Sequence, residues 1–446
     1  MKSYFYCLAG CPGQHPIFKP IFSCPQCHGL IDVGHDVDAL RATTADEWKT
    51  RLQSRQVGPS VREQSGVWAH HEWVMPGIKE EEIVSMGEGR TPLTASAHLA
   101  DQYGIGGVYV KQCGQSLTGS FKDLGMTVLV SMANAMRERG EDIRALVCAS
   151  TGDTSAALAA YGAKARIPVV VLLPKGKIST AQLVQPMANG AHVFALSGDF
   201  DQCMNVVQEL VERPGIFLAN SKNPLRIEGQ KTVAFEIAAQ LNWNVPDFVA
   251  VPSGNLGNVS ALYQGFLLLR ELGLTQSIPR LIACQVDAAN PLFRAYEAGL
   301  ESLDPVLAQD THASAIRIGS PVSWPRAQKA LRATNGMVTS IGETELLTVS
   351  NEMDHAGFFA CPHTATAMGG IKALAHAGLI GKTDSVVVVS TAHGLKFSEQ
   401  KVDFHEGRPF VSEMTMDPSL EGYRNIPEEL PASLKHVEDA LLRRLN

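Results

Sequence analysis

The sequence predicts an α/β protein in which two parallel-sheet domains flank a cofactor cleft. Short β-branched runs alternate with alanine-rich stretches whose hydrophobic period is 3.6 residues. The short runs are apolar almost throughout, which is typical of strands buried on both faces of a parallel sheet. A chain of 446 residues, 45% of them hydrophobic, is long enough for about two or three domains.

Residues 106–226 contain the first set of alternating elements, and we expect them to form the smaller α/β domain. The expected strand and helix pairs are Val108–Val110 with Phe121–Arg139, Ala145–Ala149 with Thr154–Ala165, Pro168–Leu173 with Thr180–Ala188, and Ala191–Leu196 with Asp201–Glu212. Ligands of open α/β sheets bind beyond the carboxyl ends of the strands, so the loops after these strands are candidate sites.

Residues 227–416 contain the second set, and we expect them to form the larger α/β domain. Its expected elements are the helices Ile227–Leu241 and Val259–Leu269 and the strands Phe248–Pro252, Leu281–Val286 and Val386–Ser390. Residues 1–105 are rich in His, Trp, Pro and charge, and indicate an irregular N-terminal extension with a few short helices. Residues 417–446 read as a polar C-terminal tail that ends in a helix, Leu430–Leu445.

The composition argues against several classes of protein. A net charge of −7 does not fit a basic nucleic-acid or polybasic membrane surface. The longest apolar runs, such as Val169–Leu173, are strand-sized and far shorter than the ~20 residues of a membrane helix. The N-terminus has no long apolar segment that would indicate a signal peptide. We therefore expect a cytoplasmic protein whose nine cysteines stay mostly reduced.

The loop Ser116–Asp123 (SLTGSFKD) opens onto an apolar helix and places Lys122 in its first turn. The positive end of the helix dipole disfavours the charged form of a lysine there, and so predicts an easily deprotonated amine. A Schiff-base lysine needs such an amine. The alternative is a solvated lysine that follows a serine cap.

Three further loops also follow predicted strands. Ser150–Thr154 (STGDT) combines hydroxyl groups and a glycine at a helix start, which suits a carboxylate or phosphate, although Thr151 and Thr154 could be ordinary caps. Ser253–Asn258 (SGNLGN) has two glycines that allow close approach of a phosphate, with a plain tight turn as the alternative. Ser390–Lys396 places a hydroxyl, that of Thr391, at a strand end, where a local cap is the alternative.

The four loops together suggest pyridoxal phosphate as the cofactor. An anion-binding glycine loop suits its phosphate, a deprotonated lysine suits its aldehyde, and its ring stores carbanion charge. The Gly254–Asn258 loop lacks the G-K-[ST] of a Walker loop and the third glycine of a dinucleotide fingerprint, so a cofactor with a single phosphate fits better.

The chain resembles the threonine synthases, pyridoxal-phosphate enzymes of the tryptophan-synthase-β fold type (fold type II), and among them the plant-type branch. The resemblance runs from about Gly29 to Phe397. The segments that carry it are Lys111–Met126, Ala149–Ala160, Gln182–Gly190, Ala219–Thr232, Val251–Asn258, Cys361–Thr364 and Val387–Phe397.

The resemblance implies a role for each matching residue. Lys122 would bond the cofactor, with Thr391 beside its pyridine nitrogen and Asp153 beside its 3-oxygen. The cofactor phosphate would lie on the loop of Gly254, Asn255, Leu256, Gly257 and Asn258. The substrate would be bound by Ser150, Thr151, Thr154, Asn220, Ser221 and Arg226. Arginine suits a phosphate dianion because its planar fork binds two oxygens and keeps its charge.

Asp153 departs from other branches of the fold type, which have asparagine there. An ionised aspartate would repel a phenolate-like oxygen, so either a proton is shared or Asp153 lies further away. The plant-type branch has the same aspartate.

The implied reaction converts O-phospho-L-homoserine and water to L-threonine and phosphate by γ-elimination and β-addition. The alternative is a cysteate synthase-like paralogue that uses O-phosphoserine and sulfite, and a catalytically idle protein of the same fold is a more distant one. We expect a homodimer, with a monomer as the alternative.

Four cysteines lie near the N-terminus within residues 5–30, in a zinc-ribbon-like pattern. Cys24 and Cys27 have the spacing of a zinc knuckle, whereas Cys7 and Cys11 are one residue further apart than is common. His15 or His28 could replace one of them. A four-cysteine structural zinc site is one interpretation, and four reduced cysteines in a loop-rich segment are the other.

Overall fold

The computed structural model describes residues 2–55, 58–150, 152–175, 180–198, 200–408 and 417–445, without the side chains of residues 180–182, 200 and 201. The chain divides into two compact units, Met1–Phe397 and Ser398–Asn446. The first unit contains the three sheets of the described residues. The second contains α17 (Ser398–Glu406) and α18 (Leu434–Leu445), which confirms a helix near the expected C-terminal position.

The larger sheet of the first unit has six strands in the order β12-β11-β10-β13-β5-β4. All neighbours are parallel except β4, which runs antiparallel to β5. The strands are β4 (Leu93–Ala95), β5 (Gly107–Gln112), β10 (Phe248–Pro252), β11 (Arg280–Val286), β12 (Met337–Ile341) and β13 (Ser385–Ser390).

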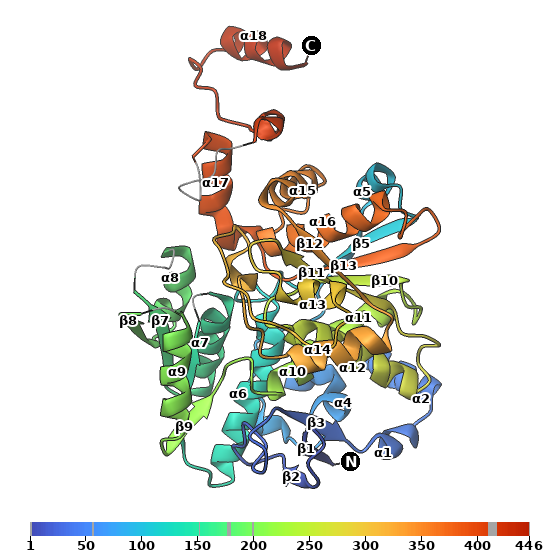
Figure 1. Cartoon of the computed structure of the whole chain (residues 1–446), viewed down its shortest axis with the longest axis vertical. Coiled ribbons are helices and arrows are strands. Elements are labelled where there is room, and N and C mark those ends of the chain that lie inside the picture. The colour runs from blue at the N-terminus through green and yellow to red at the C-terminus, as the bar shows by residue number, and fades with distance from the viewer. Residues whose placement is uncertain are drawn as a thin grey trace. The chain divides into compact units, whose positions relative to one another are not determined.

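Helices cover both faces of this sheet, as the apolar strands predict (Figure 1). Side chains alternate between the faces along each strand, so Ala250 and Val388 pack with α5 (Ala97–Tyr103) and α16 (Pro362–His376). The intervening residues, such as Val249 and Val387, belong to a second core. That core includes residues of α11 (Thr232–Gln240), α12 (Gly257–Glu271) and α14 (Trp324–Ala333).

The smaller sheet has four parallel strands in the order β8-β7-β6-β9. The strands are β6 (Ile143–Ala149), β7 (Val169–Pro174), β8 (His192–Leu196) and β9 (Gly215–Leu218). Val147 and Leu218 face α9 (Phe200–Val211), whereas Leu146 and Phe217 lie in the same core as α6 (Lys122–Glu138) and α7 (Asp153–Ala165). Both sheets therefore have the two-sided burial that the sequence predicts.

Helix α6 lies in the middle of the first unit and is buried along most of its length (Figure 1). It contacts α10 (Leu225–Gln230) through two glycines. A Cβ atom on Gly125 would lie 2.9 Å from the Arg226 carbonyl oxygen, and one on Gly229 would lie 1.7 Å from the Leu124 carbonyl oxygen. The two backbones are thus closer than any larger residue allows.

The strands and helices expected between residues 108 and 286, and at 386–390, are confirmed to within two residues at each end, with one exception. The helix expected at Ile227–Leu241 is divided at Lys231 into α10 and α11. Buried Lys231 pairs with Glu228 at 2.5 Å, and the hydroxyl of Thr232 donates to the carbonyl of Gly229 at 2.7 Å. Hydrophobic periodicity alone does not detect such a break.

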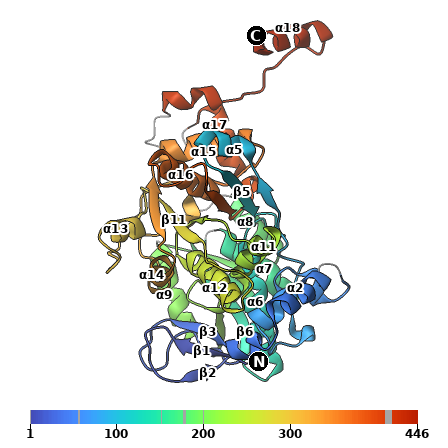
Figure 2. The same cartoon turned by 90° about the vertical axis from the view of Figure 1, so that its right-hand side faces the viewer.

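The N-terminal region differs from the irregular extension that the composition predicts. It contains the antiparallel sheet β2-β1-β3, formed by β1 (Ser3–Cys7), β2 (Gln14–Pro16) and β3 (Ile31–His35), which lies below α12 in Figures 1 and 2. These strands are at most five residues long, too short to give a clear alternating pattern. The expected short helices follow as α1 (Val37–Arg41), α2 (Ala45–Ser54), α3 (Val61–Gln64) and α4 (His71–Val74).

The expected domain division stays a prediction, and two observations bear on its boundaries. Strand β5, which the boundary at residue 106 assigns to the smaller domain, pairs with β13 in the six-stranded sheet. The first compact unit ends at Phe397, before the expected start of the tail at 417. Two helices that the sequence does not predict, α13 (Pro291–Glu297) and α15 (Glu343–His355), also pack beside the larger sheet.

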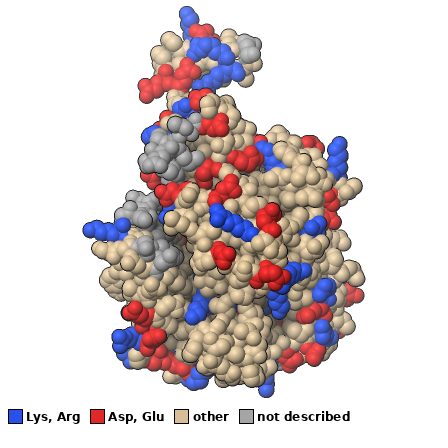
Figure 3. Space-filling model, viewed as in Figure 1, with Lys and Arg blue, Asp and Glu red and all other residues tan. Residues whose placement is uncertain are grey.

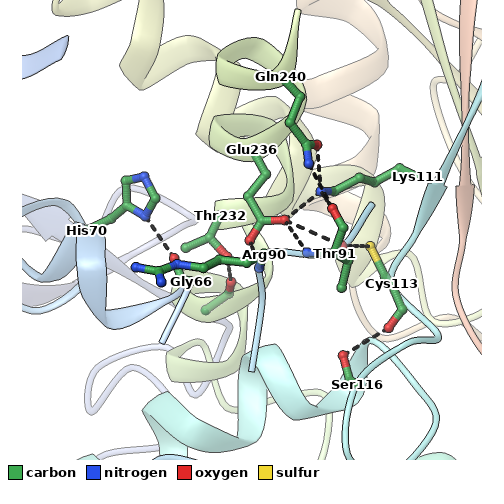
Figure 4. Close-up of polar contacts among 11 residues, drawn as sticks. Gly66, His70, Arg90, Thr91, Lys111, Cys113, Ser116, Thr232, Glu236 and Gln240 are labelled. Atoms are coloured by element: carbon green, nitrogen blue, oxygen red, sulfur yellow. Dashed lines mark hydrogen bonds and ion pairs between the residues drawn. The ribbon is translucent and has the colours of Figure 1, made fainter. Parts of the chain in front are cut away.

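The buried carboxylate of Glu236 on α11 is the centre of a polar network beside this sheet (Figure 4). It accepts hydrogen bonds from the backbone N–H groups of Arg90 and Thr91, at 2.6 and 3.1 Å. The fully buried ammonium group of Lys111 pairs with it at 2.5 Å and donates to Gln240 at 2.9 Å. The positive charge of Lys111 is thus matched within the protein.

Charges of both signs are interspersed over the face seen in Figure 3, with no large area of one sign. Within the described residues, no helix combines the length and the apolar character needed to cross a bilayer.

Candidate active site

The three strands β10, β13 and β5 are neighbours in the larger sheet, and the three loops that follow them carry predicted site residues. Because the strands are parallel, their carboxyl ends meet at one edge. The order of the strands therefore brings together Gly254–Asn258, Thr391 and Lys122. Strands β6 and β9 do the same in the smaller sheet for Ser150 and Asn220.

Lys122 is the first residue of α6, and its loop is fixed by two sets of contacts. The carboxylate of Asp123 accepts from the N–H of Thr118 at 2.9 Å and from its hydroxyl at 2.5 Å. The N–H of Phe121 donates to the carbonyl of Thr391 at 2.8 Å, which joins this loop to the end of β13. The loop after β5 and the end of β13 together therefore fix the position of Lys122.

The amine of Lys122 has a pKa lowered to about 7, as the sequence predicts, although the causes differ from those expected. Burial is the largest cause, and the positive charge of Arg226 is the second, whereas Asp153 acts in the opposite direction. The position of Lys122 in the sequence predicts the helix dipole as the cause instead. Near neutral pH, a large fraction of Lys122 is a free base.

The loop Gly254–Asn258 is shaped to bind an anion. Leu256 has a φ of 67°, and α12 begins at the next residue, so the positive end of the helix lies at this loop. Neither the side-chain nitrogen nor the side-chain oxygen of buried Asn258 has a hydrogen-bond partner among the described residues. A Cβ atom on Gly254 would lie 2.8 Å from the Cα of Ile316, so only glycine fits there.

Thr391 follows β13 and is 5% exposed. Its backbone N–H donates to the hydroxyl of Thr364 at 3.3 Å, and that hydroxyl donates to Ser390 at 3.2 Å. The Thr391 hydroxyl makes no hydrogen bond to the described residues. It is therefore available to a ligand.

The loop Ser150–Thr154 begins α7. The Ser150 hydroxyl accepts from the N–H groups of Gly152 and Ser155, at 3.2 and 3.3 Å, so Ser150 caps the helix. Thr151, a predicted substrate contact, lies outside the described residues. Thr154 accepts from Arg226 at 3.4 Å, which brings two predicted substrate residues together.

Arg226 on α10 is 3% exposed. Its guanidinium donates to the Ala219 carbonyl and to Thr154, both at 3.4 Å, and its Nε has no partner within the part of the chain that the structure describes. Burial lowers the pKa of Arg226 to about 10. No carboxylate of the described part of the chain forms an ion pair with it, which is unusual for a buried arginine.

Asn220 and Ser221 follow β9, but the side chain of Asn220 is engaged in the protein. Its amide oxygen accepts from the N–H of Ala149 at 3.0 Å, and its nitrogen donates to the carbonyl of Ala149 at 2.9 Å. These contacts fix the end of β6, so Asn220 positions the Ser150 loop. Ser221 is partly buried and close in sequence to Arg226.

Asp153 is buried and forms an ion pair of 3.0 Å with Lys396, a residue to which we had given no role. The ammonium of Lys396 also donates to the Thr118 carbonyl and to Gln185, both at 2.9 Å. Lys396 thus connects the Lys122 loop, α7 and α8 (Thr180–Ala188). Its position in the same segment as Thr391 was the only signal in the sequence that could have indicated it.

Comparison with known proteins gives the same picture. The sequence pattern described as "Pyridoxal-phosphate dependent enzyme" matches residues 84–392. Threonine synthase 2, chloroplastic, of Arabidopsis thaliana is 49% identical over 382 residues, which cover 85% of this chain and 74% of that protein. Threonine synthase of Methanosarcina acetivorans is 38% identical over 408 residues, covering 91% and 95%.

Solved structures share the fold. The crystal structure of threonine synthase from Escherichia coli has a TM-score of 0.69 at 22% identity and covers 99% of this chain and 100% of that one. The processed form of threonine deaminase isoform 2 from Solanum lycopersicum has a TM-score of 0.59 at 20% identity, covering 70% and 81%. At these identities the likeness concerns the fold alone.

The residues of the site fit pyridoxal phosphate. The cofactor presents an aldehyde, a pyridine nitrogen and a phosphate, and each has a matching group. The pKa of Lys122 is lowered, and the Thr391 hydroxyl makes no hydrogen bond to the described residues. The buried side-chain amide of Asn258, at the start of α12, also has no hydrogen-bond partner among them.

Proposed function

The chain belongs to the threonine synthases within the family of pyridoxal-phosphate-dependent enzymes, and from that premise we propose that it converts O-phospho-L-homoserine and water to L-threonine and phosphate at the site around Lys122. The observation that carries this proposal is a base beside a buried cation. Lys122, with a pKa of about 7, is partly deprotonated near neutral pH, and buried Arg226 has no carboxylate partner among the described residues. A base beside an unmatched cation suits a substrate that carries both an acidic C–H bond and a phosphate.

When bound, pyridoxal phosphate supplies an electron sink that makes the protons at Cα and Cβ of the substrate acidic. The Lys122 amine removes the Cα proton and then a Cβ proton. The bond between Cγ and the phosphate oxygen breaks, and phosphate leaves with the bonding electrons. Protons return at Cγ and Cα, and water adds at Cβ to give L-threonine.

The Gly254–Asn258 loop, with the start of α12, and Thr391 would hold the cofactor. Its phosphate binds the loop Gly254–Asn258, where Asn258 supplies hydrogen bonds and α12 supplies its positive end. Thr391 would donate its hydroxyl to the pyridine nitrogen. A neutral partner there would leave the ring unprotonated, which would restrain side reactions such as transamination.

Asp153 would lie beside the 3-oxygen of the cofactor, with Lys396 as the counter-ion of its carboxylate. The distance of 3.0 Å between Lys396 and Asp153 supports this role, because a paired carboxylate repels a neighbouring oxygen far less than a free one. The pair removes the difficulty that an ionised aspartate raises at this position.

The substrate is held at both ends. Its carboxylate binds the loop that contains Ser150, Thr151 and Thr154, where α7 begins. Its phosphate binds Arg226 and Ser221. Asn220 acts through its bonds to Ala149 by fixing the loop, which differs from the direct contact that the resemblance implies.

Product identification tests the proposal. We expect the purified enzyme to release L-threonine and one equivalent of phosphate from O-phospho-L-homoserine. It should produce no cysteate from O-phosphoserine and sulfite, because the relatives in the comparison are threonine synthases. Formation of cysteate without threonine would refute the proposed substrate. The homodimer and the cytoplasmic location stay predictions, which size-exclusion chromatography and cell fractionation would test.

A further inference from the structure

The sulfur atoms of Cys7, Cys11, Cys24 and Cys27 converge at one end of the N-terminal sheet. They all lie within 4.8 Å of one another, and the sulfurs of Cys7 and Cys27 are 3.5 Å apart. It is the one group of potential metal ligands in the described part of the chain, and neither His15 nor His28 belongs to it.

These distances match a single metal ion bound by four thiolates. A zinc–sulfur bond of about 2.3 Å in a tetrahedron separates the sulfurs by about 3.8 Å. A cluster of several iron ions would hold its four cysteines further apart. Without a metal, four thiol groups would be packed together for no energetic gain.

Two turns bring the cysteine pairs into position. In the first, the N–H of Gly10 donates to the carbonyl of Cys7 at 3.2 Å, and Gly10 has a φ of 87° that accommodates the additional residue before Cys11. In the second, the N–H of His28 donates to the carbonyl of Cys24 at 2.9 Å. The unusual spacing of the first pair is therefore compatible with a metal site.

The sheet that leads from this cluster is attached to the rest of the unit by buried charges. Asp32 on β3 pairs with Arg326 of α14 at 2.6 Å. His35 on the same strand contacts Glu228 at 2.6 Å, two residues from Arg226 on α10. The N-terminal sheet thus contacts the helix that carries the proposed phosphate-binding arginine.

We propose that Cys7, Cys11, Cys24 and Cys27 bind one zinc ion, which fixes the β1–β3 sheet against α10 and α14. The site is structural: all four ligands come from the protein, so no position is open to a substrate. A redox-inert metal ion also keeps the four thiolates from pairing as disulfides.

Metal analysis of the purified full-length enzyme tests this inference. We expect about one zinc per chain, released by a thiol reagent that modifies the four cysteines. Refolding with Co²⁺ should give the intense sulfur-to-cobalt absorption bands of a tetrahedral thiolate site. Iron as the bound metal, the absence of any metal, or disulfides among these cysteines in non-reducing mass spectrometry would overturn the proposal.

The double variant Cys24→Ser/Cys27→Ser should lose at least about nine-tenths of the zinc, as two of four ligands are removed. Its melting temperature should fall and should no longer respond to a chelator. The matched control is Cys284→Ser in β11, which should keep the zinc of the native enzyme. A double variant with the same zinc content as the native enzyme would also overturn the proposal. If the variant folds poorly, the metal analysis of the native enzyme still tests the proposal.

Discussion

Buried positive charge is paired with a carboxylate in the network around Glu236, but not in the site around Lys122. Lys111 is fully buried and pairs with the Glu236 carboxylate at 2.5 Å (Figure 4). Arg226 is buried almost as deeply and has no carboxylate partner among the described residues, and its charge lowers the pKa of Lys122. The first region is complete without a ligand, whereas the second has a positive charge to be matched by an anion from solution.

This difference separates structural from functional charge. A buried charge without a partner costs several kcal/mol, so a protein that keeps one gives up stability. Under the proposed function, the site around Lys122 gives up that stability and gains affinity for phosphate and a lysine with a lowered pKa. Substitutions in the two regions should therefore have different consequences.

The largest expected effect is that of Lys122→Met on turnover. We expect a loss of about 10³-fold or more, because the variant lacks both the nucleophile for the cofactor and the base. The visible band of the lysine-bound cofactor should disappear with it. A variant with normal turnover in a steady-state phosphate-release assay would contradict the assignment.

The same variant should make the cofactor-free protein more stable at low pH. Below a pH of about 7, Lys122 is charged in the folded native chain. Its replacement there gives the full gain in the free energy of unfolding. Between pH 7 and 10.5, the unfolded chain binds a proton that the folded chain has released, so the gain declines as the pH rises. Urea denaturation of both proteins at several pH values measures this trend.

Substitution in the Glu236 network should destabilise the fold instead. Lys111→Met leaves a buried carboxylate without its cation, and we expect a loss of about 3–5 kcal/mol in the free energy of unfolding. The matched control is Lys19→Met, because Lys19 pairs with Glu141 on the surface and should contribute less than about 1 kcal/mol. Equal effects in urea denaturation would remove the distinction between the two regions.

Arg226→Gln should weaken substrate binding and leave the cofactor in place. Loss of the charge opposite a buried phosphate should lower kcat/KM by roughly 30- to 1,000-fold, or about 2–4 kcal/mol, mostly through KM. Arg226→Lys should recover part of this, since it keeps the charge and loses the fork. If the cofactor were lost instead, Arg226 would bind the cofactor phosphate.

The smallest expected effect is that of Lys396→Met on the pKa of Lys122. Without Lys396, the charge of Asp153 is no longer balanced, and Asp153 raises the pKa of Lys122. We expect a rise of about one pKa unit, or about 1.4 kcal/mol, above the value of about 7. The pH dependence of cofactor capture by the apoenzyme reports it, and Lys396→Arg should restore the original profile. An unchanged midpoint would show that Lys396 acts only as packing.

The parts of the fold that repeat were predictable from the sequence. Strands β6 and β10 are apolar almost throughout, helices α6 and α7 have a helical hydrophobic period, and each has a glycine or hydroxyl residue close to one end. Strand β12 and helix α15 were not predicted, although β12 pairs with β11 in the larger sheet. Residues 298–323, which contain neither an α-helix nor a strand, interrupt the strand–helix alternation before them.

The candidate site was predictable where one residue carries the chemistry, and not where a contact crosses the fold. Lys122, Gly254 and Arg226 lie in recognisable sequence motifs. The pairing of Asp153 with Lys396 joins residues more than two hundred positions apart, and the bond of Asn220 to Ala149 joins two strands. Such pairs depend on the order of strands in the sheets, which hydrophobic periodicity does not determine.

The close approach of α6 and α10 at Gly125 and Gly229 has a consequence for substrate length. These helices begin with Lys122 and carry Arg226 in their first turns, and their backbones touch without intervening side chains. Under the proposed function, this contact sets how far the base lies from the phosphate site, and therefore which length of substrate fits. A residue larger than glycine at either position would move α10 away from α6 and change that length.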